Sequence, residues 1–321
     1  MTARLLRLVI ALIMLTIPAA AQDWPQRNVR IIVGFGPGGG TDIVGRILAQ
    51  ALQDRLGKPV VVENRPGAGG TIGAEAVARA EKDGHTIGIM TNGHVIAAVL
   101  AKSLRYDTLT AFDPVSLIAT ASLAIVARPD FPANGAKELV DLAKSRPGKI
   151  TFASVGFGGT QHFTGEMFKQ VAGVEMLHVP FRTSPEAISA VLGGQVDLVF
   201  DTVSALLGHI QSGALKALAV TGGERFPAVP NVPAAIESGV LPGFAVTTWY
   251  GIFLPQGTAP EIVKKLNAVL NEALADPEVK EKLTKAGVVA QGSTPEAFGK
   301  HIADEMVRWN RVREAAGIPQ Q

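Results

Sequence analysis

The stretch VRIIVGFGPGGGTDIVGRILAQALQDRLG, residues 29–57, determines the fold class of this chain. Val29 to Val33 is short, β-branched and apolar, which predicts a buried strand. Thr41 to Leu56 carries apolar residues at helical spacing and is followed by Gly57, which predicts a helix. A glycine-rich loop joins the two segments. A strand, a glycine loop and a helix in this order indicate an α/β unit with a parallel sheet.

The same alternation of strand and helix signals continues along the chain in two series. The first series continues with strands at 59–62 and 86–90, separated by a helix at 71–80. The second series begins near residue 149 and repeats the pattern. It predicts strands at 149–153, 177–179, 196–200 and 215–220, with helices at 160–171, 185–192 and 205–212. We therefore predict two α/β units, each with a mainly parallel sheet flanked by helices.

The end of the chain predicts how these units are connected. Helices at 260–275 and 295–315 have no comparable series of strands between them, so we expect them to pack on the first unit. The second unit is then inserted into the first, and two crossing segments join two lobes that can hinge. The predicted division is lobe 1 at 22–123 plus 246–321, lobe 2 at 124–245, and crossings at 123–128 and 246–253.

The first 21 residues have the pattern of a secretory signal peptide. Arg4 and Arg7 precede an apolar run over 8–17, and Ala19-Ala20-Ala21 supplies small residues at a cleavage site before Gln22. The apolar run is shorter than the roughly 20 residues that a membrane-spanning helix needs. Because the chain has no cysteine, it also lacks a site for a bacterial lipid anchor. We expect a soluble periplasmic protein.

Composition narrows the function classes. The 321 residues are 47% hydrophobic and 18% charged, which is typical of a globular protein. Of the 30 Lys and Arg residues the predicted leader holds two, and it holds none of the 28 acidic residues, so the remaining chain is formally neutral. Without basic clusters, binding to nucleic acid is not expected. Without cysteine there is no disulfide, thiolate metal site or cysteine nucleophile.

The tripeptide Gly-Gly-Thr occurs three times at corresponding places, namely 39–41, 69–71 and 158–160. Each threonine is predicted to be the N-cap of the helix that follows. Each glycine pair leaves backbone N–H groups uncovered by side chains. The first and third copies follow strands of different lobes, at the carboxyl ends where open α/β sheets bind ligands. Although one copy alone indicates only a tight turn, two in facing loops predict an anion site.

Two other kinds of chemistry compete with an anion site. Gly34 to Gly39 fits the G-x-G-x-x-G pattern of dinucleotide binding, and Glu63 follows the second strand. Pro37 removes an N–H from that loop, and nicotinamide cofactors are not expected outside the cytoplasm, so we expect no cofactor. Ser154 lies in a sequence that lacks the first glycine of G-x-S-x-G, which leaves a secreted hydrolase as the weaker alternative.

The remaining polar and aromatic residues do not form a recognisable metal or catalytic site. The six histidines, among them His162 and His178, show no metal-ligand spacing. Asp201 follows a strand and is expected to be a polar wall of the cleft rather than half of a catalytic pair with Asp197. Arg182 either pairs with a ligand carboxylate or is a solvated surface residue. Of Trp249 and Tyr250, we expect one in the core and one in the cleft wall.

Several longer motifs resemble the Bug family, the periplasmic substrate-binding proteins of tripartite tricarboxylate transporters. The resemblance runs from Trp24 to about Ile318. Its strongest stretches are Gly34 to Asp42 and Val61 to Gly70, which read GFGPGGGTD and VVENRPGAGG. Further matches are Thr91-Asn92-Gly93, Asp113-Pro114-Val115-Ser116, Thr160-Gln161-His162, His178-Val179-Pro180, Leu192-Gly193-Gly194-Gln195-Val196-Asp197, Pro230-Asn231-Val232-Pro233 and Gly292-Ser293-Thr294-Pro295-Glu296.

This resemblance implies a two-lobed type II periplasmic binding fold that closes over a small organic acid. It implies that the carboxylate is held by the loops at 35–42 and 156–162. Members of that family bind di- and tricarboxylates, acidic amino acids or aromatic acids, and their partners are membrane components of the transporter. The chain departs from the family pattern at Gly34 and Gly36, which replace prolines, and at 180–184. The identity of the ligand is therefore not transferred from any relative.

Together these inferences predict a monomeric solute-binding protein that is neither an enzyme nor a metalloprotein. A ligand-sensing adaptor for a membrane signalling protein would need the same cleft and is the main alternative, because both roles need only ligand-dependent closure. Backbone N–H groups of the two glycine loops would bind the carboxylate, aromatic side chains would form the walls, and polar side chains would select the distal end of the ligand. The expected ligand-binding residues are Phe35, Gly38, Gly39, Gly40, Thr41, Asp42, Asn92, Gly158, Gly159, Thr160, Gln161, His162, Phe181, Arg182, Asp201, Thr202 and Thr248.

Overall fold

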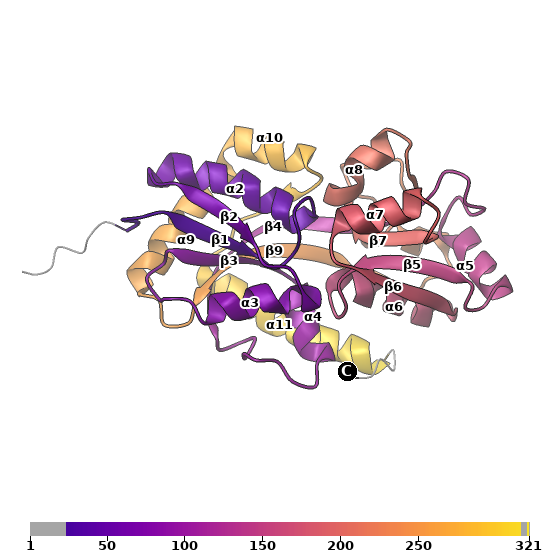
Figure 1. The fold of residues 1–321 in the computed structure, drawn as a ribbon, viewed down its shortest axis with the longest axis horizontal. Helices are drawn as coiled ribbons and strands as arrows, with labels where there is room; N and C mark the ends of the chain where they lie inside the picture. Colours follow the sequence, from indigo (N-terminus) through magenta and orange to yellow (C-terminus); the bar gives the residue numbers. More distant parts are fainter. Residues whose placement is uncertain (1–23, 316–319, 321) are drawn as a thin grey trace, which may run out of the picture.

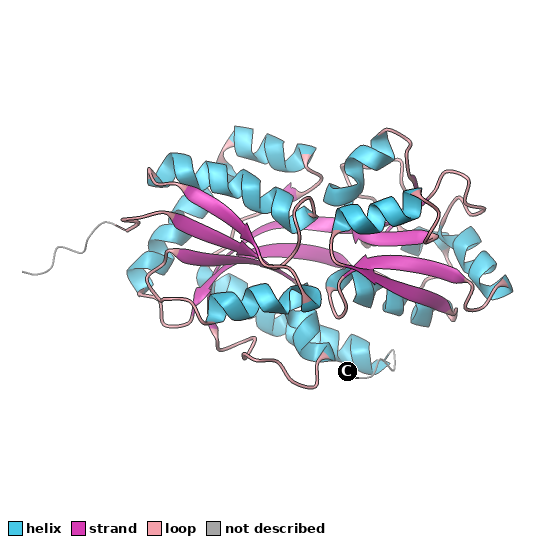
Figure 2. Ribbon diagram, in the orientation of Figure 1, coloured by secondary structure: helices cyan, strands magenta, loops and turns pink. Residues whose placement is uncertain are grey.

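The computed structural model of the chain describes residues 24–315 and Gln320, so the predicted signal peptide lies outside the described residues. The elements form two halves along the long axis of the molecule, each with its own sheet and helices (Figure 1). Helices cover both faces of the strands in each half (Figure 2). This arrangement is the predicted two-lobed α/β fold.

The first half is built on a sheet in the order β2-β1-β3-β9-β4, with β10 on the far side of β4. β1, β2 and β3 run parallel to one another, while β9 runs antiparallel to both β3 and β4. The strands of this sheet are β1 (Val29–Val33), β2 (Val60–Asn64), β3 (Thr86–Thr91), β4 (Phe112–Ala127), β9 (Thr247–Pro255) and β10 (Val289–Ala290).

The second half repeats this arrangement around the far end of β4. There β4 pairs antiparallel with β7 and with β8, and β7, β5 and β6 follow as parallel neighbours. The strands are β5 (Ile150–Val155), β6 (Met176–Phe181), β7 (Leu198–Thr202) and β8 (Lys216–Val220). All four strands of the second predicted series are therefore present.

β4 connects the two halves and changes partner along its length. Residues 112–122 pair with β9, and residues 123–127 pair with β7 and β8. The change falls at Leu123, where the sequence places the first crossing segment. The other expected crossing, 246–253, overlaps β9. The exact division into lobes stays a prediction.

The helices lie in two sets that follow the two sheets. α9 contacts α2 and β4, α10 contacts α2, and α11 contacts α4 and β4, so the chain returns to the first half at its end. None of the described helices combines the length and the apolar character needed to cross a membrane. The helices are α2 (Gly40–Leu56), α3 (Thr71–Ala78), α4 (Gly93–Leu100), α5 (Ala136–Ser145), α6 (Thr160–Ala172), α7 (Ser184–Leu192), α8 (Val203–Gln211), α9 (Pro260–Ala275), α10 (Pro277–Lys285) and α11 (Pro295–Ala315), with short 3₁₀ turns η1 (Ala68–Gly70) and η2 (Ala235–Ser238).

Candidate functional site

The loop before α2 is fixed by a buried carboxylate. Asp42 accepts hydrogen bonds from the backbone N–H of Gly38 (3.0 Å), from Arg46 Nε (2.9 Å) and from Asn64 Nδ2 (2.9 Å). Burial alone would raise the pKa of Asp42, but these hydrogen bonds outweigh it and hold the pKa below its ordinary value. Both carboxylate oxygens are therefore used within the loop, and Asp42 supports the site rather than facing a ligand.

The loop before α6 is fixed in the same way by a neutral ring. The backbone N–H of Gly158 donates to His162 Nδ1 (3.2 Å). The His162 ring stacks between Phe157 and His178, with ring centroids 4.5 and 4.2 Å away. Burial lowers the pKa of His162, so the imidazole is neutral and can accept this hydrogen bond. His162, like Asp42, therefore stabilises the conformation of its own loop through a hydrogen bond to the backbone.

The prediction that threonines cap the three helices is wrong. The N-cap residues are Gly39, Gly70 and Gly159, each one or two positions before the expected threonine, and none makes a side-chain cap hydrogen bond. A glycine N-cap leaves the helix N–H groups open, which favours the predicted anion site. The threonine hydroxyls find other partners: Thr160 Oγ1 donates to Asn92 Oδ1 (3.0 Å).

Asn92, expected to select the distal end of the ligand, instead ties the two halves together. It is fully buried, and its Oδ1 accepts from Thr160 Oγ1 and from Thr248 Oγ1 (2.7 Å). Its Nδ2 donates to the backbone carbonyl of Thr247 (2.9 Å). Asn92, Thr160 and Thr248 thus form an internal network that joins the start of α6 to β9.

The two halves approach each other most closely at glycines. A Cβ on Gly40 would lie only 2.5 Å from Thr202 Oγ1 and from Ser204 Oγ, and 2.8 Å from the Tyr250 hydroxyl. In the same way, a Cβ on Gly69 would lie 2.8 Å from the backbone nitrogen of Gly159. Each glycine loop therefore packs directly on the facing half, and a side chain at either position would hold the halves apart.

Four helix N-termini converge on a cavity between the halves. Its volume is about 10 Å³, close to the space that one water-sized group needs. The starts of α2, α6, α7 and α8 all contribute to its lining, together with Phe35, and no lining side chain is charged. Orphan backbone N–H groups and helix dipoles at this point favour an anion. The lining residues are Phe35, Gly36, Gly39, Gly40, Thr41, Val155, Gln161, Ser184 and Thr202.

Behind this cavity lies a fully buried carboxyl group. Asp201 Oδ1 accepts from Gln161 Nε2 (3.2 Å) and from the backbone N–H of Thr202 (2.7 Å). Burial raises the pKa of Asp201, and the hydrogen bonds from Gln161 and Thr202 offset only part of that effect. Asp201 is thus held by Gln161 and Thr202, which line the cavity, while its own side chain is fully buried.

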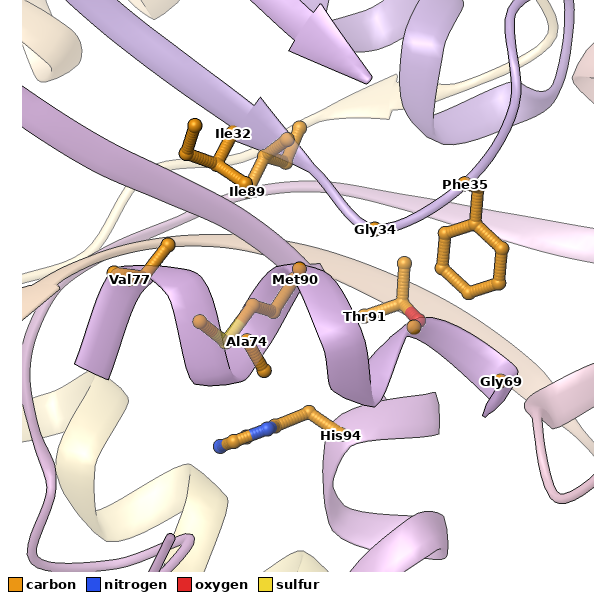
Figure 3. Close-up of a pocket in the computed structure, with 12 residues that line it drawn as sticks. Ile32, Gly34, Phe35, Gly69, Ala74, Val77, Ile89, Met90, Thr91 and His94 are labelled. Carbon is orange, nitrogen blue, oxygen red and sulfur yellow. The ribbon is translucent and has the colours of Figure 1, made fainter. Parts of the chain in front are cut away.

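A larger chamber of about 340 Å³ lies next to the anion site. Phe35, Phe181 and Arg182 line it, together with the 66–70 loop and Ile72. Phe35 also lines the small cavity between the halves and a third, apolar cavity of about 20 Å³ beneath its loop, where Figure 3 shows its ring near Gly69 and away from Val77. Phe35 is therefore a partition between spaces as well as the expected apolar wall. Gly158 borders a separate space of about 300 Å³ beside Phe157.

The structure brings a histidine to Ser154, which the sequence did not predict. Ser154 Oγ lies 2.6 Å from His178 Nε2 and donates to the carbonyl of Gly156 (3.2 Å). Ser154 is fully buried, and burial together with His162 and Lys169 lowers the pKa of His178 to about 3. The pair therefore lies beneath the loop rather than at a surface that a substrate reaches. In the described part of the chain, no cluster of three or more His, Cys, Asp or Glu could hold a metal ion.

Sequence analysis did not single out Ser184 or Ser204 as site residues, and it left open which of Trp249 and Tyr250 faces the cleft. Ser184 is the first residue of α7 and Ser204 the second residue of α8, each after a strand of the second half, which is the same signal that identified the glycine loops. Tyr250 is fully buried with its hydroxyl facing Gly40, while Trp249 packs on Phe298 with ring centroids 5.5 Å apart. Both rings are therefore buried in the core, and the Tyr250 hydroxyl lies against the glycine loop before α2.

Known proteins resemble this chain over nearly its whole length. BugT of Bordetella pertussis is 36% identical over 302 residues, which cover 94% of this chain and 92% of BugT. The solved structure of the periplasmic binding protein BugD has a TM-score of 0.89 and 38% identity, covering 93% of this chain and all of that one.

Two further solved structures contain organic acids. A Rhodopseudomonas palustris protein solved with adipate is 32% identical, has a TM-score of 0.89 and covers 92% of this chain and 99% of its own. MatC of the same organism, solved with malate, is 35% identical, has a TM-score of 0.85 and covers 90% and 99%. The model of the tripartite tricarboxylate transporter family receptor, TctC, matches residues 44–318. The chain therefore belongs to the TctC family of periplasmic substrate-binding proteins, which are not enzymes.

Proposed function

We propose that this protein captures one small organic carboxylate between its two lobes and delivers it to the membrane components of a tripartite tricarboxylate transporter. Residues 1–21 direct its export to the periplasm, where it acts as a monomer. Lobe 1 is 22–123 with 246–321, and lobe 2 is 124–245. Closure of the lobes about β4 and β9 buries the ligand.

The convergence of four helix N-termini on one uncharged cavity carries this proposal. Two of these helices, α2 and α6, are long enough to present a full set of orphan N–H groups, and glycine N-caps leave those groups accessible. A carboxylate held there receives hydrogen bonds from both lobes at once. Binding therefore favours the closed arrangement over the open one.

The adjoining chamber supports a ligand with a body larger than one carboxylate. At about 340 Å³ it falls in the range of small-molecule sites, and its walls are mostly apolar. Arg182 lines this chamber, and its side chain forms no ion pair within residues 24–315. A second acidic group is therefore accommodated at the distal end, as in the adipate and malate of the two related structures.

Ligand binding is tested by thermal shift after the protein has been unfolded and refolded to remove any captured compound. The panel contains citrate, malate, succinate, adipate, aspartate, nicotinate and phthalate, with NAD as the control for dinucleotide binding. A ligand at 100 times its Kd stabilises the folded state by ~2.7 kcal/mol. For a chain of this size that is an increase in Tm of about 5 °C.

The expected result is a shift with at least one acid and none with NAD. An Arg182→Ala variant then tests the distal end: it should weaken diacids and leave a monoacid unchanged. If no acid shifts the Tm and mass spectrometry finds no acid released on unfolding, carboxylate capture is wrong. Uptake of the identified acid by cells with and without the gene tests delivery to the transporter.

A further inference from the structure

Three buried polar atoms at the site have no hydrogen-bond partner within the described part of the chain. They are Gln161 Oε1, Asp201 Oδ2 and the Tyr250 hydroxyl. Gln161 lines the cavity between the halves and is 8% exposed, whereas Asp201 and Tyr250 are fully buried. A buried polar atom without a partner destabilises the folded state, so three together at one place indicate a ligand group rather than a packing defect.

These atoms are joined by contacts and belong to one small region. Gln161 Nε2 donates to Asp201 Oδ1, and the Tyr250 hydroxyl lies near Gly40, which lines the cavity together with Gln161. In this arrangement, the cavity of about 10 Å³ has room for one water-sized group, the size of a hydroxyl or an ammonium. Gln161 Oε1 can only accept, Asp201 Oδ2 accepts when the carboxyl group is ionised, and the Tyr250 hydroxyl both donates and accepts. The missing partner is therefore a hydrogen-bond donor.

We propose that Gln161, Asp201 and Tyr250 form a subsite for a donor group carried on the carbon next to the ligand's carboxylate. This inference rests on the proposed function, because the carboxylate must be held at the neighbouring helix N-termini. The site then prefers 2-hydroxy or 2-amino acids to acids that carry only hydrogen at that carbon. An acid without the donor leaves the buried acceptors unpaired and is rejected.

The charge state of Asp201, which depends on its surroundings, determines whether an ammonium or a hydroxyl group is preferred. Gln161 of α6, Ser184 of α7 and Thr202 at the start of α8 are neutral, and the ionisable group that faces Asp201 is Tyr250 of β9. The charged side chains at the start of α2, Asp42 and Arg46, pair with each other. An ammonium group would pair with ionised Asp201. A hydroxyl would instead bind beside the neutral acid that burial favours.

Calorimetric titration of the refolded protein with succinate, malate and aspartate tests the subsite. The three acids have the same carbon chain and differ only in hydrogen, hydroxyl or ammonium at the second carbon. We expect malate or aspartate to bind about tenfold to a hundredfold more tightly than succinate. Tighter malate identifies the hydroxyl and tighter aspartate the ammonium. Succinate within threefold of both overturns the subsite and leaves carboxylate capture intact.

Two conservative variants assign the preference to these atoms. Tyr250→Phe removes one hydroxyl, and Asp201→Asn replaces one acceptor oxygen with a donor without changing shape. Each should reduce the ratio between the preferred acid and succinate at least fivefold. The matched control is Asp197→Asn, since the Asp197 carboxylate accepts from Thr151 (2.8 Å) away from the cavity.

The outcomes of these titrations are distinct. An unchanged ratio in both variants overturns the assignment. Loss of all three acids in Tyr250→Phe and Asp201→Asn but not in Asp197→Asn, with normal Tm, also overturns it, because that result makes the two residues part of the carboxylate site itself. Absence of binding by any acid to the unmodified protein contradicts the proposed function instead.

Discussion

The loops before α2 and α6 have the same backbone geometry, although their supporting side chains have opposite chemistry. Gly38 and Gly158 have φ of +81° and +79°, and the following glycine is the N-cap in both. Four residues beyond the first glycine, Asp42 and His162 each accept a hydrogen bond from its N–H, at 3.0 and 3.2 Å. The loop before α2 is supported by a carboxylate, and the loop before α6 by a neutral imidazole.

The charges one turn further along each helix are also reversed. Arg46 lies 2.9 Å from Asp42, whereas Glu166 lies 3.9 Å from His162. The comparison shows that the conformation of each loop needs a glycine with positive φ and a hydrogen-bond acceptor four residues later. The acceptor does not need to be charged. The charges instead determine under which conditions each loop is stable. Three predictions test this difference.

The largest effect is expected from making the two loops alike at the first helical residue. In the structural register, Gly40 corresponds to Thr160. Because a Cβ at Gly40 would lie 2.5 Å from Thr202 and Ser204, Gly40→Thr should prevent close approach of the halves. We expect affinity for the ligand to fall about a hundredfold, the effect of overpacking by a few kcal/mol. Titration with the acid found by thermal shift measures it.

The converse change, Thr160→Gly, serves as the comparison. It removes one hydrogen bond to Asn92 and opens no clash, so the affinity should fall by about tenfold or less. If Gly40→Thr binds as well as the unmodified protein, the close approach seen at Gly40 is not needed for capture, and the two loops differ less than their contacts indicate.

How far the sequence predicted this site is clear from the same two loops. The repeated Gly-Gly-Thr correctly located both loops but aligned them one residue out of register, since Thr41 corresponds structurally to Gln161 and not to Thr160. Composition alone does not show which glycine has positive φ, because that depends on the facing half. The cap prediction failed for this reason, while the anion-site prediction did not depend on the register.

The fold was predictable where strands and helices alternate with clear periodicity, and less so elsewhere. β1 and α9 have the predicted bounds. α4 was missed because Gly93 to Leu100 is buried on nearly every side and therefore lacks a polar face. Most of β4 was missed because Asp113-Pro114 suggests a loop, and its bulges interrupt the pairing there. Contacts between halves, such as Asn92 with Thr248, leave no signal in local sequence.

A smaller effect is expected from removing the charged support. Asp42→Ala leaves Gly38 N–H, Arg46 and Asn64 without their acceptor, so we expect the free energy of unfolding to fall by about 2 kcal/mol. That corresponds to a decrease in Tm of about 3–4 °C. Arg46→Ala, which removes a half-exposed partner, should lower it by under about 1 kcal/mol. Equal losses in the two variants would mean that the ion pair, not the backbone hydrogen bond, stabilises the loop.

The smallest and most specific effect is the pH dependence of the two supports. The pKa of His178 is lowered to about 3 and that of His162 is lowered too, so the unfolded chain takes up protons first as pH falls below about 6.5. The stabilisation from these neutral rings is complete above that pH and is lost progressively on acidification towards 3. Asp42 behaves differently: its lowered pKa gives stabilisation that persists until pH falls below about 4.

Urea unfolding at pH 7.5, 6.5, 5.5 and 4.5 separates these contributions. The unmodified protein should lose stability between pH 6.5 and 4.5, and His178→Phe, which keeps the stacking against His162, should lose less over that range. Ser154 retains the Gly156 carbonyl as acceptor in this variant, so its hydroxyl is not left unpaired. Asp42→Asn should lower stability at every pH above 4.5 without changing the slope. A slope that responds to Asp42→Asn but not to His178→Phe would show that acid acts first on the loop before α2, and the contrast between the charged and neutral supports would be wrong.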